Sequence, residues 1–157
     1  MRGTDPSPEP DVEPLRNVIM RAPTGTDGWE AFELWVARRY GVSHRPNEAE
    51  WYDCRDPSSN TKYEAKTCQR VLSTGVPGRF RVWKDQLERL EDEQQIDGRA
   101  GWVVFGLLES DGERIARYRR MQASTVLDLV EDRGGFNAAS HEERDSRQHK
   151  LPWEAVF

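Results

Sequence analysis

The chain contains few cysteines and no long apolar segment, and these two absences exclude several classes of protein. Its 157 residues include two cysteines, Cys54 and Cys68. Two thiols are too few for a disulfide framework or a cysteine-rich zinc site. No apolar run approaches the length of about 18 residues that a membrane span needs, and the apolar centre of a signal peptide is also missing. We therefore expect a cytoplasmic protein with no membrane partner.

Histidine is also scarce, and its positions do not form a metal-binding pattern. The three histidines, His44, His141 and His149, are scattered along the chain. We expect each of them at the surface, without a role in binding metal. No segment repeats at a fixed period.

Residues 1–22 differ in composition from the rest of the chain. This segment holds several acidic residues and four prolines, Pro6, Pro8, Pro10 and Pro14. Such a composition cannot bury enough apolar surface to offset the entropy lost on ordering. We expect a disordered tail at 1–22 and a single domain at 23–157, which is long enough to bury a core.

The net charge of −5 argues against a protein that binds nucleic acid with its whole surface. The charge is unevenly distributed, however, because no acidic residue occurs in 65–84. A local basic strip on an acidic protein can follow a phosphate backbone. The alternative is a surface loop with scattered arginines. The basic residues of the strip are Lys66, Arg70, Arg79, Arg81 and Lys84.

The first predicted helix covers 28–40. Asp27 is a suitable N-cap, and Glu30 follows it at the spacing of a capping box. Glu33 lies beside the apolar stripe of this helix, where a carboxylate is costly unless it has a partner. Helical spacing predicts that the buried stripe consists of Trp29, Phe32, Val36 and Tyr40.

The pattern that points most directly to chemistry lies in 51–67. An aromatic run at 51–54 reads as a strand that contains Asp53, 55–60 as a turn, and 61–67 as a returning strand. Side chains alternate along a strand, so Glu64 and Lys66 share one face while Ala65 points to the other. Two carboxylates of the kind that bind Mg²⁺ can thus meet a lysine that stabilises charge on a phosphate. The alternative is an ordinary solvated face of a strand.

The remainder of the chain is predicted to alternate strands and helices. The segment 79–83 alternates basic and apolar residues, which suits a half-exposed strand or the start of a helix. Next come a helix at 84–95, a buried strand at 101–108, an arginine-rich edge strand at 115–121 and a helix at 125–132 capped by Ser124 or Thr125. We expect a polar loop at 136–150. The apolar segment 151–157 is expected to dock on the protein itself or on a second subunit.

A helix with an acid, a strand with Asp53, a strand with Glu64-Ala65-Lys66 and a further helix resemble the PD-(D/E)xK nuclease superfamily. Within it the short layout is most similar to archaeal Holliday-junction resolvases and their viral relatives. The residue before Asp53 is Tyr52 where the family pattern has proline. The resemblance implies an α/β fold with a restriction-endonuclease-like core, in which helices flank a mixed sheet of about four to six strands.

The resemblance also implies a metal-dependent endonuclease that hydrolyses DNA phosphodiester bonds. Asp53, Glu64 and the Ala65 carbonyl would bind Mg²⁺, which Mn²⁺ can replace, and Glu33 would be preferred over Glu30 as the acid from the first helix. Lys66 would act on water or phosphate, with Gln86 as a secondary catalytic candidate. Arg70, Arg79, Arg81 and Lys84 would bind DNA.

Several alternatives stay open at this level. A restriction or repair nuclease has the same signature as a resolvase. A catalytically inactive DNA-binding module and a protein-interaction domain with solvated charges also fit the composition. A resolvase must cut two strands symmetrically, so it would act as a homodimer, and 151–157 is a candidate for part of the interface.

Overall fold

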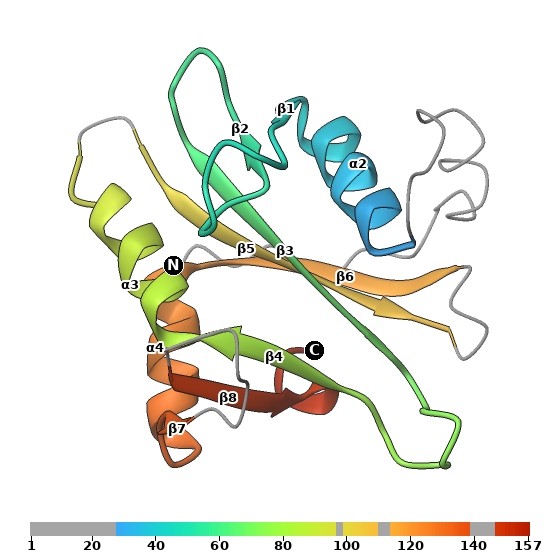
Figure 1. Ribbon diagram of the computed structural model, residues 1–157. Coiled ribbons are helices and arrows are strands. Elements are labelled where there is room, and N and C mark those ends of the chain that lie inside the picture. The colour runs from blue at the N-terminus through green and yellow to red at the C-terminus, as the bar shows by residue number, and fades with distance from the viewer. Residues whose placement is uncertain (1–27, 97–98, 110–113, 139–146) are drawn as a thin grey trace.

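The computed structural model describes residues 28–96, 99–109, 114–138 and 147–157 (Figure 1). The predicted tail at 1–22 lies outside these ranges. The helices are α2 (Gly28–Tyr40), α3 (Lys84–Glu93) and α4 (Ala123–Asp132), with a 3₁₀ helix at Trp153–Ala155. The strands are β1 (Ser43–His44), β2 (Cys54–Arg55), β3 (Lys62–Gln69), β4 (Arg79–Trp83), β5 (Gly101–Leu108), β6 (Ile115–Gln122), β7 (Asn137–Ala138) and β8 (Arg147–Pro152).

The strands form two sheets. The larger sheet is mixed and has the order β1-β2-β3-β5-β6, in which only β3 and β5 are parallel neighbours within the described ranges. The smaller sheet has the order β4-β8-β7 and is antiparallel. Helices flank the five-stranded sheet, so the predicted α/β architecture with a restriction-endonuclease-like core is confirmed (Figure 1).

Helix α2 covers one face of the larger sheet. Phe32 and Val36 of this helix are fully buried against Tyr63 of β3 and Val104 of β5. The predicted apolar stripe is therefore correct for these two residues and for Tyr40, which is partly buried against the same core, and Trp35 extends it. The predicted cap Asp27 and the side chain of Trp29 lie outside the part that the structure describes.

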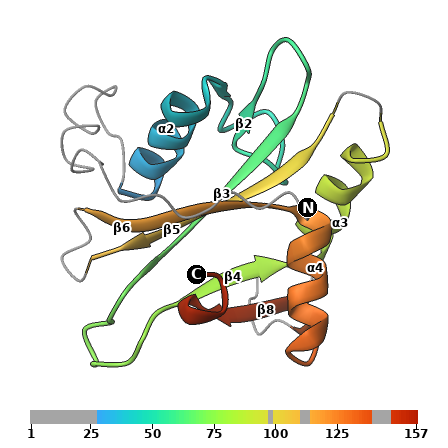
Figure 2. The same ribbon diagram turned by 180° about the vertical axis from the view of Figure 1, so that it is seen from behind.

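The opposite face of the larger sheet is covered by α3, α4 and the smaller sheet (Figures 1 and 2). The alternate residues Val103 and Phe105 of β5 point to this side, where Phe105 meets Phe80 of β4 edge-on at 4.9 Å between ring centroids. β5 is thus buried on both faces, as its continuous apolar run predicted. β6 is an edge strand, also as predicted, and β1 forms the other edge.

The predicted strand at 51–54 is wrong for most of its length. Only Cys54 belongs to β2, whereas Trp51 and Tyr52 lie in an irregular segment before it. The Tyr52 hydroxyl donates a hydrogen bond to Glu48, and the Trp51 ring packs edge-on against Tyr52. These aromatic side chains are held by local contacts, not by strand pairing.

The predicted cap of α4 is also wrong. The N-cap residue is Gln122, which makes no side-chain capping bond, so neither Ser124 nor Thr125 has that role. The side chain of Gln94, at the C-cap of α3, takes over the function instead. Its Oε1 accepts the Ser124 N–H at 3.1 Å, and its Nε2 donates to Ser124 Oγ at 3.1 Å. The residue that ends α3 therefore hydrogen-bonds to the first turn of α4.

The predicted loop at 136–150 contains all of β7 and the first part of β8, while 139–146 lies outside the described residues. Their polar side chains are compatible with strands because one face of the smaller sheet is not in the core. The apolar segment 151–157 packs on the protein's own core, since Leu151 and Val156 are buried there. Trp153 and Phe157 of the same segment are only partly buried, so its proposed part in a subunit interface stays a prediction. No helix in the described ranges is long and apolar enough to cross a membrane.

Gly106 of β5 allows α2 to approach the sheet closely, and this generates the first prediction. A Cβ atom at Gly106 would overlap the Phe32 ring. We expect Gly106→Ala to lower the free energy of unfolding by about 1–3 kcal/mol through overpacking. Chemical denaturation followed by tryptophan fluorescence measures the loss. Phe32→Leu makes room for the new Cβ atom. The double variant should therefore lose less free energy of unfolding than the two single variants lose together. Additive losses would show that the ring is not the obstacle.

Candidate active site

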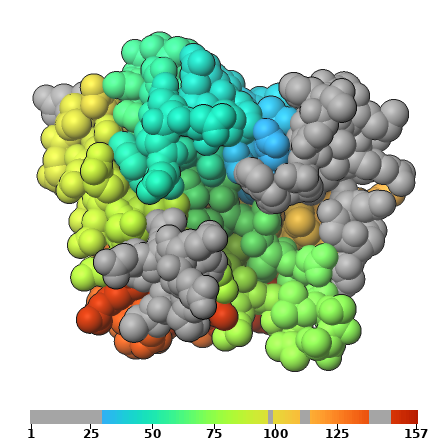
Figure 3. Space-filling model, in the orientation of Figure 1, coloured from blue at the N-terminus to red at the C-terminus, as the bar shows by residue number. Residues whose placement is uncertain are grey.

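Strand β3 carries the central charged residues on one face. Glu64 and Lys66 point to the side of α3, and Lys66 Nζ lies 3.1 Å from Glu64 Oε1. Ala65 points to the α2 side, where it packs against the core. The predicted alternation is therefore present. Part of β3, in green, is visible at the surface between the segment around β1 and β2 and helix α3 (Figure 3).

Asp53 is brought to this face by hydrogen bonds to β3. Its backbone N–H donates to Tyr63 O at 2.8 Å, and its carboxylate Oδ2 accepts the Ala65 N–H at 2.9 Å. Its carboxyl group also lies close enough to that of Glu64 for each to shift the pKa of the other. The two predicted acids therefore meet, although Asp53 precedes β2 and does not lie within a strand.

Burial makes the charged forms of these two acids unfavourable. It raises the pKa of Glu64 to about 8, with the neighbouring Lys66 opposing the shift and Asp53 reinforcing it. Burial also raises the pKa of Asp53, against the lowering effects of the Ala65 N–H and Lys66. Two adjacent carboxyl groups cannot both ionise cheaply without a cation. A proton on Glu64, donated towards Asp53, relieves their repulsion when no cation is bound.

Gln86 fixes the position of the lysine. Lys66 Nζ donates to Gln86 Oε1 at 2.9 Å, while Gln86 Nε2 donates to the backbone carbonyl of Glu50 at 2.7 Å. Gln86 is buried near the start of α3. The structure thus brings the secondary candidate Gln86 into direct contact with Lys66.

Glu33 lies on the other side of Asp53. Its side chain is buried on α2 and hydrogen-bonds His44 Nε2 at 2.9 Å. Burial raises the pKa of Glu33, the His44 bond lowers it, and the nearby Asp53 raises it further. Glu30 is half-buried at the start of the same helix. Of the two candidate helix acids, Glu33 is the one adjacent to Asp53.

The prediction that all histidines are surface residues is wrong for His44, whose side chain is 14% exposed. β1 pairs with β2 and places His44 opposite Cys54, which follows Asp53 directly. Sequence spacing gave no signal for this pairing, because β1 has only two residues. His149 is also half-buried, with Nδ1 2.9 Å from Gly135 O, and His141 lies outside the described ranges.

The donor set at Asp53 and Glu64 fits a divalent cation. Two carboxyl groups in contact, with raised pKa values, form a site where a hard cation would replace the proton and remove the repulsion. Within the described ranges, no three His, Cys, Asp or Glu side chains converge as a metal cluster. Completing the coordination would therefore need backbone oxygen, such as the Ala65 carbonyl, and water.

The predicted basic strip is divided among three elements. Arg70 follows β3 and lies 3.9 Å from Glu109, Arg79 and Arg81 lie on β4, and Lys84 begins α3. All four are exposed. The pairing of β4 with β8 adds Lys150, opposite Arg81, which sequence reasoning missed because the two strands are far apart in the chain.

Comparison with known families agrees with this geometry. The chain matches the family model described as PD-(D/E)XK nuclease superfamily domain over residues 22–157. The chain therefore belongs to the PD-(D/E)XK nuclease superfamily. A search of curated proteins found no match.

The raised pKa of Glu64 predicts how stability depends on pH. The folded protein keeps a proton on Glu64 up to about pH 8, whereas the unfolded chain loses it near the ordinary value of 4.5. Because the folded state binds more protons in this window, stability must fall as pH rises through it. Glu64→Gln cannot titrate. We therefore expect its free energy of unfolding to decline less than that of the wild type, by on the order of a few kcal/mol.

Denaturation in EDTA at several pH values between about 5 and 8 tests this expectation. EDTA keeps divalent cations from competing with the proton. Parallel profiles for the two proteins would show that Glu64 is ionised in the folded state.

Proposed function

We propose that this member of the superfamily is a metal-dependent endonuclease that hydrolyses phosphodiester bonds in DNA. The observation that carries the proposal is the close approach of the half-buried Asp53 carboxyl group and the buried Glu64 carboxyl group beside Lys66. A core position for two acids is costly unless a positive charge neutralises them. Lys66 provides one positive charge for the two carboxyl groups, and a divalent cation would provide the rest. Membership of a nuclease superfamily supplies the reason for keeping such a site.

Each residue has a distinct role in the proposal. Asp53, Glu64 and the Ala65 carbonyl would hold Mg²⁺, with Mn²⁺ as a substitute, and Glu33 would ligate a second metal ion or hold a metal-bound water. The bound ion would act as a Lewis acid and lower the pKa of water. Lys66 would orient the attacking water or stabilise charge on the phosphate. Gln86 would keep the Lys66 ammonium in place, since it accepts a hydrogen bond from Nζ.

The basic residues give the proposed DNA contacts. Arg70, Arg79, Arg81 and Lys84 are exposed, and Lys150 lies directly across from Arg81 on the neighbouring strand. Phosphate contacts of this kind position DNA without reading its sequence. The domain at 23–157 would thus combine chemistry and binding, in a cytoplasmic setting.

Among DNA substrates we favour a branched structure such as a four-way junction, on the basis of the small size and the resemblance to resolvases. A restriction or repair nuclease is the second candidate, and an inactive DNA-binding module is the third. Cutting both strands of a junction needs two active sites, so this substrate implies a homodimer. The partly buried Trp153 and Phe157 keep the apolar segment 151–157 as a candidate for part of its interface.

We expect Mg²⁺ or Mn²⁺ to support cleavage and EDTA to abolish it. Lys66→Ala should reduce the cleavage rate by at least about 100-fold, because the group facing the phosphate is lost. Labelled four-way junction and matched linear duplex, incubated in parallel, measure both activity and preference. Cleavage in EDTA, or a wild-type rate in Lys66→Ala, would contradict the proposed mechanism.

The matched pair Glu33→Ala and Glu30→Ala is the control for the helix acid. Both remove a glutamate from α2, but only Glu33 is buried beside Asp53. Glu33→Ala should impair cleavage far more. The reverse ranking would transfer the role to Glu30.

Binding should depend on the basic residues through counterion release. Arg81→Ala and Lys150→Ala should each weaken DNA affinity and flatten the log–log salt dependence by about one unit per lost phosphate contact. Fluorescence anisotropy at several salt concentrations measures the slope. Arg38→Ala is the control, because Arg38 is exposed on α2, across the sheet from β4. Equal slopes in all variants would remove β4 and β8 from the DNA-binding surface.

A further inference from the structure

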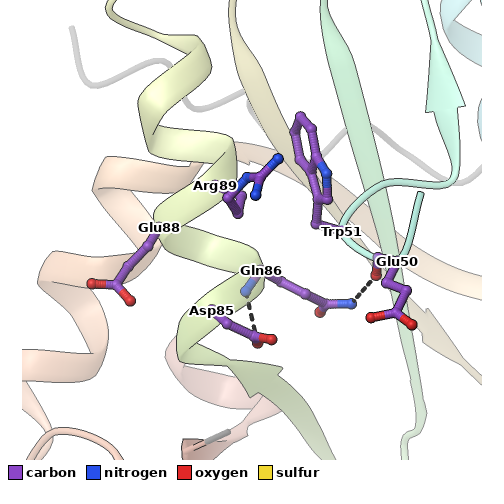
Figure 4. A pocket seen from close by; sticks show the side chains of 6 residues that line it. All are labelled: Glu50, Trp51, Asp85, Gln86, Glu88 and Arg89. Carbon is purple, nitrogen blue, oxygen red and sulfur yellow. Dashed lines mark hydrogen bonds between the residues drawn. The ribbon is translucent and has the colours of Figure 1, made fainter.

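A cavity of about 320 Å³ lies beside the candidate active site, between α3 and the irregular segment before β2 (Figure 4). Gln86 lines the cavity and also contacts Lys66 of the candidate active site. Its Oε1 accepts from Lys66, and its Nε2 donates to Glu50 O at the edge of the cavity. An occupant of the cavity would therefore be separated from Lys66 by one side chain. The lining residues are Glu50, Trp51, Asp85, Gln86, Glu88 and Arg89.

The charges around the cavity restrict what it can bind. Three carboxylates line it against one guanidinium. A phosphate group would be repelled by this excess of negative charge. Glu50 and Asp85 lie on the same side of Gln86, whereas Glu88 points away (Figure 4). Ionised carboxylates only accept hydrogen bonds. The cavity therefore favours an occupant that carries N–H donors and no negative charge.

Trp51 supplies a flat apolar wall. Its indole is half-buried, with two cations near the ring at 5.7 Å (Lys62 Nζ) and 5.2 Å (Arg89 Cζ). Lys62 is buried and paired with Glu93 at 3.4 Å, so it is fixed. Arg89 is exposed on α3 and can move away. Stacking of a nucleobase on an aromatic ring is stronger than an exposed cation–π contact, so a base can replace Arg89 on the indole.

We propose that this cavity receives an unpaired nucleobase next to the bond that is cut. The base would stack on Trp51, and its exocyclic amino group would donate a hydrogen bond to Glu50 or Asp85, because carboxylates accept hydrogen bonds from such groups. The displaced Arg89 would then be available to a neighbouring phosphate. The inference rests on the proposed nuclease function and narrows its substrate. A paired base must first leave the duplex stack, which costs free energy, so the cavity favours DNA with an unpaired nucleotide near the cut.

The test compares two DNA duplexes that differ in one group. Each carries a single unpaired nucleotide, which has a base in one duplex and is abasic in the other. Affinity is measured by fluorescence anisotropy in EDTA, so cleavage is not needed. We expect wild-type protein to bind the duplex with the base at least about fivefold more tightly, in keeping with stacking energies per base. Trp51→Leu should lose this preference while keeping apolar volume.

Two control variants separate stacking from general effects. Trp102→Leu makes the same change on the α2 side of the sheet, where Trp102 packs against that core, and should keep the preference. Arg89→Ala removes the side chain that covers the indole and should keep or increase the preference. Because Arg89 is exposed, this variant tests the idea even if Trp51→Leu does not fold.

The outcomes distinguish this inference from the nuclease proposal. Equal wild-type affinity for the two duplexes overturns the base site, even if Mg²⁺ supports cleavage. A preference that survives in Trp51→Leu, or that is lost equally in Trp102→Leu, also overturns it. A preference that depends on Trp51 in a protein that cleaves nothing would keep the base site and reject the nuclease function.

Discussion

Two hydrogen bonds between Asp53 and β3 determine the geometry of the whole candidate site. One fixes the backbone of Asp53 to Tyr63, and the other fixes its carboxylate to the Ala65 amide. Tyr63 and Ala65 point to the α2 core, so Glu64 and Lys66 must point to the opposite face. A shift of one residue in this register would turn the charged pair into the α2 core. The burial of Tyr63 in the α2 core therefore fixes the register of β3, and this register positions the two acids.

The same register explains why charged residues are tolerated in a central strand. β3 lies between β2 and β5, and Glu64 is almost fully buried. The free-energy cost of burying Glu64 is offset by the Lys66 ammonium and by the proton or cation at the two acids. Gln86 contributes by holding Lys66 in place. Breaking one of these contacts leaves the others with an uncompensated buried charge. The site is consequently a single electrostatic unit.

Periodicity in the sequence predicted the elements whose side chains face a core. The α2 helix, the β3 strand and the β5 strand have patterns set by burial, and the alternation of β3 placed Glu64 with Lys66. The position of Gln86 followed from a helix directly after β4. These predictions needed only local spacing, because α2 and β3 each have one apolar face. Both faces of β5 are apolar.

Contacts between distant segments could not be predicted in this way. Aromatic residues at Trp51 and Tyr52 suggested a strand, yet their side chains are held by Glu48 and by each other. His44 reaches Glu33 through a two-residue strand that has no periodicity. β8 is polar because one of its faces is not in the core, and nothing local shows that it pairs with β4.

The pairing of β4 with β8 has a consequence for protein synthesis. A chain leaves the ribosome from its N-terminus, and α3, β5, β6 and α4 are all made between these two strands. Until β8 emerges, Phe80 of β4 lacks its partner Leu151, and the sheet beside α3 is incomplete. Asp53, Glu64 and Lys66 are already present at that time, but the helix that carries Gln86 is not yet fully supported. The nascent chain thus contains the charged groups of the site before it has the framework that aligns them.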